Sequence, residues 1–347
     1  MPAQGSALAL RAPYLLFIGD TQDRIYAKTG FGILQWAPER VIGQLRLPGC
    51  GVRLDTEELT LTEAAGRGAG SLVIAVAPVG GRLPEHWNSV VLEAIALKMD
   101  IVAGLHSRLR DNPQFVEAAR AHGVKLVDVR VPPTGIPVGT GKKRAGRRIL
   151  TVGTDCAVGK KYTALALTQA MRSAGMNATF RASGQTGIMI AGAGIPIDAV
   201  VSDFVSGAAE LLSPANDPDH WDVVEGQGSL FHPGYAAVTL GLVHGSQPDA
   251  MVLCHTAGLS EIDGWPGFSV PPLDECMEAY LAAARLTNRG TRFVGISINS
   301  SGLEPNERRA CLDRLASTHG LPCVDPLVDG TAAIVDHLKQ SFGGRTS

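Results

Sequence analysis

The stretch GTDCAVGKKYT, from Gly153 to Thr163, decides the fold of this chain. It follows the apolar segment 148–152 and precedes the helical pattern of residues 162–173, so it predicts a strand, a glycine-bounded loop and a helix in succession. In such a unit, backbone N–H groups of the loop and the free N-terminus of the helix converge on one point and favour an oxyanion there. The stretch therefore predicts a phosphate site, with Lys160 as a point charge for a terminal or bridging phosphate.

Two details of this loop depart from the usual nucleotide-binding loop. Five residues rather than four separate Gly153 from Gly159, and this longer loop resembles the dethiobiotin synthetase branch of P-loop enzymes. Lys161 occupies the position at which Mg-nucleotide enzymes place a serine or threonine hydroxyl on the metal. Thr163 lies two positions further on, about 200° around the helix, so it cannot replace that hydroxyl. The loop favours a phosphate-rich ligand but argues against magnesium and phosphoryl transfer.

The first half of the chain alternates between predicted strands and helices. Strands are expected at 14–18, 72–77, 100–103 and 124–129, and helices at 87–99 and 113–122. Asn112 or Asp111 is positioned to cap the second of these helices, and Gly123 to end it. Because this alternation builds a parallel sheet with crossover helices, residues 1–135 are expected to form a Rossmann-like domain.

Proline and glycine crowd residues 132–141 and mark a domain boundary. The basic run at 142–148 is expected to be a solvated linker or, alternatively, a source of positive potential near an anionic ligand. Beyond it, the sequence predicts strands at 148–152, 178–182, 222–224, 250–254 and 292–298, with helices at 162–173 and 273–287. Residues 136–347 are therefore expected to form a second α/β domain with a P-loop NTPase-like parallel sheet.

The composition is that of an ordinary soluble α/β protein. The 347 residues are 45% hydrophobic, and the formal net charge of −2 gives no general attraction to nucleic acid or anionic lipid. No secretory leader pattern and no run of about 18 apolar residues is present. The six cysteines show neither CxxC nor metal-ligand spacing, which indicates reduced thiols. We therefore expect a cytoplasmic protein that needs no metal.

Polar side chains follow two further predicted strands. In VEGQGSL, Glu225 is a candidate general base, metal ligand or positioning group, and Gln227 and Ser229 follow it. The segment RASGQTG suits an oxygen-rich substrate through Arg181, Ser183, Gln185 and Thr186. Arg181 is the candidate carboxylate binder of this group.

Three more titratable side chains are candidates for the site. Asp203 lies in SDFVSG, His232 in LFHPG, and His255 directly after a predicted strand. A lone histidine is more often held structurally, so both readings stay open for His232 and His255.

Several motifs together resemble the DgcN family of D-glutamate N-acetyltransferases. They are APVGGRLPEHW (77–87), the segment at 104–106, DVRVPP (128–133), GTDCAVGKKYT (153–163), SGQTG (183–187) and VEGQGSL (224–230), within a resemblance that runs from about Tyr14 to His337. The resemblance implies a Rossmann-like domain, a P-loop domain, and acetyl transfer from acetyl-CoA to the amine of a D-amino acid, typically D-glutamate. Coenzyme A carries phosphates, and acyl transfer needs no magnesium, so the resemblance accounts for Lys161.

With this resemblance, the phosphate loop becomes the expected coenzyme site. Its candidate residues are Thr154, Asp155, Cys156, Ala157, Val158, Gly159, Lys160, Lys161, Tyr162 and Thr163. Glu225 is the expected general base, Asp203 and His232 are the alternatives, and backbone N–H groups of residues 226–229 would stabilise the oxyanion. The expected substrate-binding residues are Arg181, Ser183, Gln185, Thr186, Gln227 and Ser229.

Two other functions remain compatible with the sequence. An ATP- and Mg-dependent ligase or synthetase of the dethiobiotin synthetase kind is supported by GTDxxxVGK and the Glu225 loop, whereas Lys161 argues against it. A nucleotide-sensing regulatory protein is compatible with the loop but explains the polar residues at the strand ends less well. We further expect a homo-oligomer that acts on a small molecule, without nucleic-acid or membrane partners, and the role of the first domain stays open.

Overall fold

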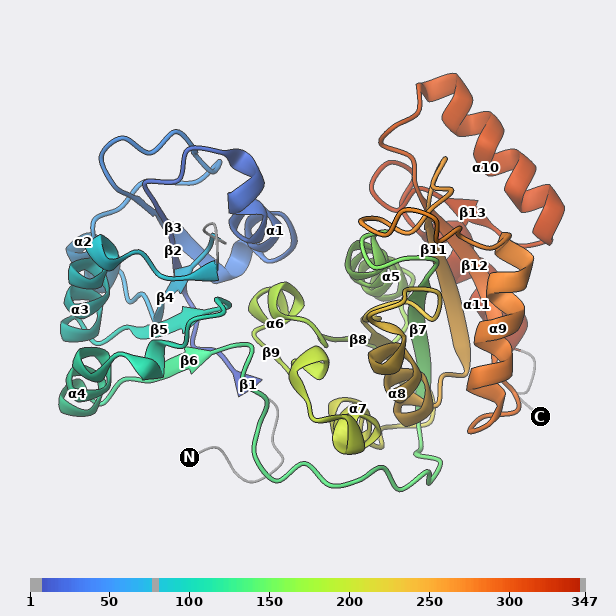
Figure 1. Ribbon diagram of the computed structural model, residues 1–347, viewed down its shortest axis with the longest axis horizontal. Helices are drawn as coiled ribbons and strands as arrows, with labels where there is room; N and C mark the ends of the chain where they lie inside the picture. The colour runs from blue at the N-terminus through green and yellow to red at the C-terminus, as the bar shows by residue number, and fades with distance from the viewer. Residues whose placement is uncertain (1–7, 77–80, 344–347) are drawn as a thin grey trace.

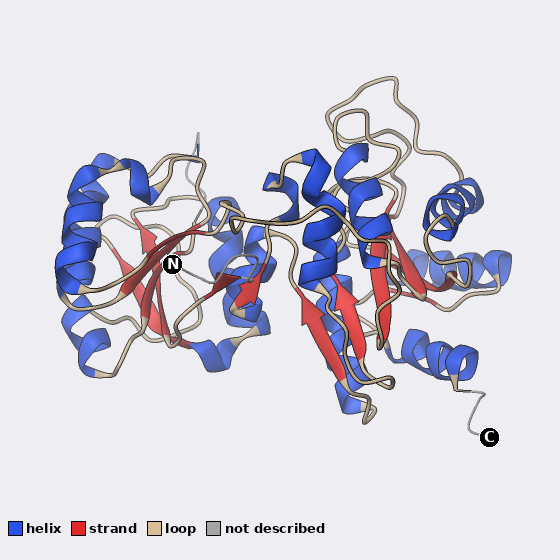
Figure 2. Ribbon diagram, turned by 90° about the horizontal axis from the view of Figure 1, so that it is seen from below, coloured by secondary structure: helices blue, strands red, loops and turns tan. Residues whose placement is uncertain are grey.

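Two parallel β-sheets, one from each half of the chain, organise the computed structural model (Figure 1), which describes residues 8–76 and 81–343. Helices flank both sheets, and the two sheets form separate groups of strands (Figure 2). This is the two-domain α/β architecture expected from the sequence. The turn expected around residues 78–80, and with it part of the first resembling motif, lies outside the described residues.

The first sheet contains five parallel strands in the order β3-β2-β4-β5-β6. They are β2 (Tyr14–Gly19), β3 (Val41–Arg46), β4 (Ser71–Ile74), β5 (Asp100–Ala103) and β6 (Leu126–Asp128), and the helices that accompany them are α1 (Lys28–Trp36), α2 (Leu61–Gly66), α3 (Asn88–Ala96) and α4 (Pro113–His122). All six residues of β2 are buried, because helices cover both faces of a parallel sheet. The predicted strands and helices of this half are confirmed, with ends shifted by a few residues.

Helix α4 shows how local sequence determines a helix. The Asn112 side chain accepts a hydrogen bond from the backbone N–H of Gln114 at 3.0 Å, Pro113 occupies the first helical position, and Gly123 ends the helix at φ +67°. Each residue satisfies a requirement of a helix end, namely a side-chain acceptor, a residue that needs no N–H, and a left-handed conformation. The predicted cap at Asn112 and stop at Gly123 are confirmed.

The second sheet has six parallel strands in the order β13-β12-β11-β7-β10-β8. They are β7 (Arg147–Gly153), β8 (Ala178–Arg181), β10 (Trp221–Val224), β11 (Ala250–Thr256), β12 (Arg292–Asn299) and β13 (Cys323–Val324). The helices of this half are α5 (Lys160–Ser173), α6 (Gln185–Ala191), α7 (Val205–Leu212), α8 (Ala236–Ser246), α9 (Leu273–Arg285), α10 (Pro305–His319) and α11 (Ala332–Phe342). Strand β7 lies between β10 and β11, which brings the phosphate loop to the middle of the carboxyl edge.

Segments of the second half also complete the first. Ile188, Met189 and Ile190 of α6 belong to the apolar core of the first half, and α6 lies beside α1 (Figure 1). In addition, β1 (Leu8–Ala9) pairs antiparallel with β9 (Ala193–Gly194). The two halves therefore share a core as well as a linker.

The basic run at 142–148 includes a structural arginine, Arg148. Arg148 is only 1% exposed, and its guanidinium donates to the carbonyl oxygens of Arg144, Ala145, Gly146 and Pro214. It lies at the amino end of β7, whereas the phosphate loop lies at the carboxyl end. The interpretation of this run as a wholly solvated linker is wrong for Arg148, because a buried guanidinium needs these acceptors.

The six cysteines are free thiols, in agreement with the expected reduced state. Within residues 8–76 and 81–343, no helix has the length and apolar character needed to cross a bilayer.

Candidate functional site

The phosphate loop connects β7 to α5 through a tight glycine-bounded turn. Gly159 has φ +93°, a conformation that favours glycine. A Cβ atom at Gly153 would lie 2.7 Å from Val158 and 3.0 Å from Lys160 Nζ. The loop therefore closes tightly over the end of β7 and leaves the first N–H groups of α5 free for an anion.

Lys160 is directed inward by the loop itself. Its side chain is buried, and Nζ donates to the carbonyl oxygens of Asp155 at 2.7 Å and Cys156 at 2.9 Å. An ammonium group has three N–H donors, so one remains for a ligand. Burial lowers the pKa of Lys160, while neighbouring groups, including Glu225, oppose that shift.

Two of the ten expected loop residues support the loop from behind. Thr154 Oγ1 lies 2.9 Å from His255 Nδ1, and the Asp155 carboxylate accepts the backbone N–H groups of Cys156 and Asp263. Neither Thr154 nor Asp155 lines the adjoining cavity, whereas all eight residues from Cys156 to Thr163 do.

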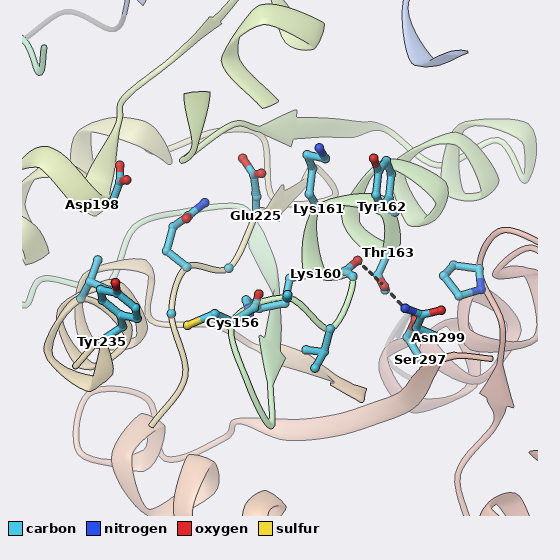
Figure 3. Close-up of a pocket in the computed structure, with 18 of the residues that line it drawn as sticks. Cys156, Lys160, Lys161, Tyr162, Thr163, Asp198, Glu225, Tyr235, Ser297 and Asn299 are labelled. Atoms are coloured by element: carbon cyan, nitrogen blue, oxygen red, sulfur yellow. Dashed lines mark hydrogen bonds between the residues drawn. The ribbon is translucent and has the colours of Figure 1, made fainter. Parts of the chain in front are cut away.

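One cavity of about 1350 Å³ extends along the carboxyl edge of the second sheet. Pockets for a single drug-sized ligand are typically about 300–1,000 Å³, so this cavity has room for a large ligand or for two ligands. Figure 3 shows its layout: Asp198 and Tyr235 lie at one end, Glu225, Cys156 and Lys160 in the middle, and Ser297 and Asn299 at the other end.

The hydroxyl of Thr163 is already engaged within the protein. Thr163 Oγ1 donates to the Gly159 carbonyl oxygen at 3.1 Å and lies 2.7 Å from Ser297 Oγ (Figure 3). Lys161 Nζ lies 4.4 Å from the centre of the Tyr162 ring. The residue at the usual metal-binding position is thus a lysine whose ammonium group lies over the Tyr162 ring, and it provides no hydroxyl for a metal.

Glu225 is the buried carboxyl group of the cavity. It follows β10, is 3% exposed, and its Oε2 accepts the backbone N–H groups of Ser183 at 2.9 Å and Gly184 at 3.0 Å. Burial raises its pKa to about 7, against the opposing effect of these hydrogen bonds and of Lys161. Within the described part of the chain no donor contacts Oε1, so that oxygen is available to take a proton.

The loop between β8 and α6 positions Glu225. Ser183 donates from Oγ to the Glu225 carbonyl oxygen and accepts from Gln227 Nε2 at 3.0 Å. A Cβ atom at Gly187 would lie 2.3 Å from Glu225 Oε2. Gln227 lines the cavity, whereas Ser183 lies behind Glu225.

The other expected substrate-binding residues lie outside the cavity wall. Arg181 Nε donates to Asp222 Oδ1 at 2.7 Å, which engages its guanidinium in an ion pair within the sheet. Gln185 and Thr186 approach the first half, near Gly104 and Gly32. Ser229 is fully buried, and its Oγ accepts the backbone N–H of Phe231.

Neither of the two alternative general bases, Asp203 and His232, lines the cavity. Asp203 is exposed on the surface. His232 is buried, with ring centres of Tyr235 and Trp265 both at 4.4 Å, and its Nδ1 accepts the backbone N–H of Gly234 at 3.0 Å.

Asp155, Cys156 and His232 form a cluster whose potential metal-ligand atoms lie within 4.8 Å of one another. Both carboxylate oxygens of Asp155 already accept backbone N–H groups, as does His232 Nδ1. Burial also raises the pKa of the Cys156 thiol, which disfavours the thiolate form that binds metals. Of these contacts, the one from the Asp263 N–H holds the phosphate loop against the segment that follows β11.

Several cavity residues were not expected from the sequence. They are Arg130, Asp198, Tyr235, Asn299 and Arg308, and they come from five separate segments. Asn299 ends β12, so the rule that ligands gather at strand ends could have found it. Arg130 lies within the motif DVRVPP, but nothing in that motif indicates a side chain directed toward the second half.

Family models match both halves of the chain. A P-loop domain described as a domain of unknown function (DUF1611_C) matches residues 137–335, and a Rossmann-like domain (DUF1611_N) matches residues 46–132. A crystal structure of a DUF1611 family protein from Anabaena variabilis has a TM-score of 0.81 at 30% sequence identity and covers 95% of this chain and 100% of that chain.

Two curated proteins resemble the chain over nearly its whole length. A protein of Tritonibacter scottomollicae named D-glutamate N-acetyltransferase is 47% identical over 95% of this chain and 99% of its own. A protein of the same name from a Pseudoalteromonas species is 44% identical over 95% of this chain and 100% of its own. The chain therefore belongs to the DUF1611 family, with its Rossmann-like and P-loop domains, and is an acyltransferase.

Proposed function

We propose that this protein is a D-glutamate N-acetyltransferase and that acetyl-CoA is its acetyl donor. The observation that carries the reaction is the identity of 47% and 44% to two D-glutamate N-acetyltransferases along 95% of the chain. The choice of donor rests on the phosphate loop, because coenzyme A is an acetyl carrier with phosphates for such a loop to bind.

The cavity has suitable groups for each part of acetyl-CoA. The free N–H groups of α5 and Lys160 would bind the pyrophosphate. Apolar side chains of the cavity wall suit the pantetheine arm; they are Ile197, Val200, Val205 and Val238. At the end of the cavity opposite Asp198, Asn299 borders space for the nucleotide (Figure 3). A volume of about 1350 Å³ leaves room for an amino acid beside the coenzyme.

Glu225 is the general base in the mechanism that we propose. The substrate ammonium gives one proton to Glu225 Oε1, and the amine lone pair then attacks the thioester carbonyl carbon. Backbone N–H groups of Gln227 and Gly228, which line the cavity, stabilise the resulting oxyanion, whereas the expected contribution of Gly226 is lost because its N–H donates to Thr151 Oγ1 at 3.0 Å. Collapse of the intermediate releases the coenzyme thiolate, which takes the proton that the nitrogen loses as the amide forms. Glu225 is favoured over Asp203 and His232 because it alone of the three lines the cavity.

One feature favours the rival ligase function. Mg-nucleotide enzymes hold their metal at a carboxylate that follows a strand beside the phosphate loop, and Glu225 has this position. The next residue, Gly226, lies against the stem of Lys160, since a Cβ atom there would be 3.1 Å from Lys160 Cδ. Lys161 argues against this function, because it supplies positive charge where a metal-binding hydroxyl is needed.

A paired assay separates the two functions. The protein is incubated with D-glutamate and acetyl-CoA while free thiol is followed, and in parallel with D-glutamate, ATP and magnesium while phosphate is followed. Thiol release that requires D-glutamate, without phosphate release, supports the acetyltransferase. Phosphate release without thiol release would favour the ligase instead.

A further inference from the structure

An ion pair between the two halves of the chain lies at the end of the cavity near Tyr235. Arg130 follows β6 of the first half, and Asp198 belongs to the second half between α6 and α7. Arg130 Nη2 and Asp198 Oδ2 are 3.5 Å apart, and both residues line the cavity. Charge-assisted hydrogen bonds are usually about 2.7–2.9 Å, so this pair is a loose one.

The other edge of the Arg130 guanidinium is held by the protein. With the Gln185 amide nitrogen donating to the Gly104 carbonyl oxygen, the Gln185 amide oxygen accepts from Arg130 Nη1 at 3.2 Å. Gln185 is the first residue of α6, which also lies beside the Glu225 carboxyl group. Arg130 is therefore oriented with Nη2 toward the cavity, and about a third of its side chain is exposed.

The remaining cations of the cavity have other partners. Lys160 donates to two loop carbonyl oxygens, Lys161 lies over the Tyr162 ring, and Arg308 contacts both Asp329 carboxylate oxygens at 2.7 Å. Of the two arginines that the structure describes in the cavity wall, Arg130 has the looser ion pair, at 3.5 Å against 2.7 Å for Arg308. The Arg130 guanidinium is therefore more available than that of Arg308 to a ligand carboxylate.

Asp198 and Glu225 act on the same part of the cavity. The Asp198 charge contributes to the raised pKa of Glu225, and Figure 3 shows both carboxyl groups along the upper wall. A cation placed between them would relieve this repulsion. An amino acid has such a cation, and it carries a carboxylate on the same carbon atom.

We propose that Arg130 binds the α-carboxylate of the amino-acid substrate and that Asp198 binds its ammonium group, which directs the nitrogen toward Glu225. One α-amino acid zwitterion bridges the two side chains, because its opposite charges are one carbon apart and match the 3.5 Å separation of the pair. This assignment rests on the proposed acetyltransferase function, and it gives the first domain a part in substrate recognition.

The test compares two variants with three substrates. Arg130→Ala and Arg130→Lys are assayed with acetyl-CoA and D-glutamate, its γ-amide D-glutamine, or its α-amide D-isoglutamine. Arg130→Ala should lower kcat/KM for D-glutamate and D-glutamine by about 10- to 100-fold, the effect of a hydrogen bond to a charged group. It should leave the value for D-isoglutamine within a few-fold, because that substrate lacks the α-carboxylate. Arg130→Lys should retain part of the activity but lose the bidentate contact.

The matched control is Arg67→Ala, since Arg67 forms an exposed ion pair with Glu57 and lies outside the cavity wall. Equal losses for D-glutamate and D-isoglutamine, or a loss that follows the γ-carboxylate, would overturn the assignment. A rise in the KM of acetyl-CoA together with a lower melting temperature would also overturn it, because Arg130 would then only join the two halves. If the wild-type protein acetylates none of these amino acids, the proposed function itself fails.

Discussion

Glu225 experiences two opposing influences on one carboxyl group. Burial raises its pKa, whereas the backbone N–H groups of Gly184 and Ser183 stabilise its ionised form. The balance leaves the pKa at about 7, so near neutral pH the group exchanges a proton readily. This is the condition that a general base requires.

Replacing Glu225 by glutamine tests this role. Glutamine retains an oxygen for the two backbone donors but cannot accept the substrate proton, so we expect turnover to fall by about 10²- to 10⁴-fold. The measurement is kcat for thiol release at saturating acetyl-CoA and D-glutamate. In the wild-type protein kcat should rise with pH through about 7, the pKa of Glu225. Near-normal turnover in the variant would exclude the assignment.

The same carboxyl group makes stability depend on pH. Its pKa is raised from 4.5 to about 7 on folding, so between these values the folded protein holds the proton that the unfolded chain releases. This contribution to the free energy of unfolding is present below the unfolded pKa and is lost as the pH rises through the folded pKa, by roughly 3 kcal/mol in total. The Glu225→Gln variant has no ionisable group at this position, so its stability lacks this dependence on pH.

Urea unfolding of both proteins at about pH 5 and about pH 8 measures this difference. The variant should gain stability relative to the wild-type protein at the higher pH. Parallel pH profiles of the two proteins would show that Glu225 ionises in the folded state as it does in water.

Lys160 provides the residue-scale test of the phosphate loop. Lys160→Ala removes the buried ammonium group, so the KM of acetyl-CoA should rise about 10-fold or more, the usual effect of losing a hydrogen bond to a charged group. The KM of D-glutamate should change much less. Lys142→Ala, at an exposed position outside the cavity wall, is the control. An unchanged coenzyme KM would remove Lys160 from this role.

At the scale of elements, α6 places the general base. The two residues just before this helix, Ser183 and Gly184, provide the N–H groups for Glu225, and Gly187 within it leaves space for the carboxyl group. Gly187→Ala would put a methyl group 2.3 Å from Oε2 and displace it. Since a misplacement of about 1 Å can reduce the rate on the order of 100-fold, kcat should fall by that amount.

Gly66→Ala is the matched control for this change. Gly66 also lies in a helix, α2, and a Cβ atom there would meet no atom within 4 Å. Its kcat should equal that of the wild-type protein. If Gly187→Ala also keeps full kcat, Glu225 does not need its observed position.

The elements predicted from the sequence share a clear local signal. Helix α4 has a cap and a glycine stop, and the central strands are continuous apolar runs. Two of the helices that were not predicted lack a helical apolar stripe. Helix α8 (AAVTLGLVHGS) has apolar residues around its whole circumference, so it shows no helical period. Helix α10 has end signals like those of α4, with Pro305 at its first position and Gly320 at its end, but it buries only Leu312 on a mostly polar sequence.

The candidate site also has one part that the sequence predicts and one part that it does not. The phosphate loop and the Glu225 loop are continuous motifs at strand ends, so the sequence predicts both. Arg130 and Asp198 lie 68 positions apart in the sequence and in different halves, so their approach depends on how the halves dock. Arg181 was expected to bind the substrate, but its guanidinium forms an ion pair with the buried Asp222 instead. No local sequence pattern reveals this pairing.

At the scale of the whole molecule, the two halves are held together by more than the linker. Residues of α6 belong to the core of the first half, and β1 pairs with β9. Cleavage at the exposed Lys142 should therefore leave both fragments together in gel filtration at the elution volume of the intact protein, and separation should require denaturant. Two fragments that elute separately without denaturant would contradict this prediction.

Helix α6 also limits how this enzyme can be recombined with its relatives. The helix is encoded within the P-loop domain but contributes Ile188, Met189 and Ile190 to the Rossmann-like core. A chimera that exchanges only the Rossmann-like domain would combine a foreign core with the native helix that aligns Glu225. A productive crossover must transfer α6 together with that domain, so the natural unit of exchange is discontinuous in the gene.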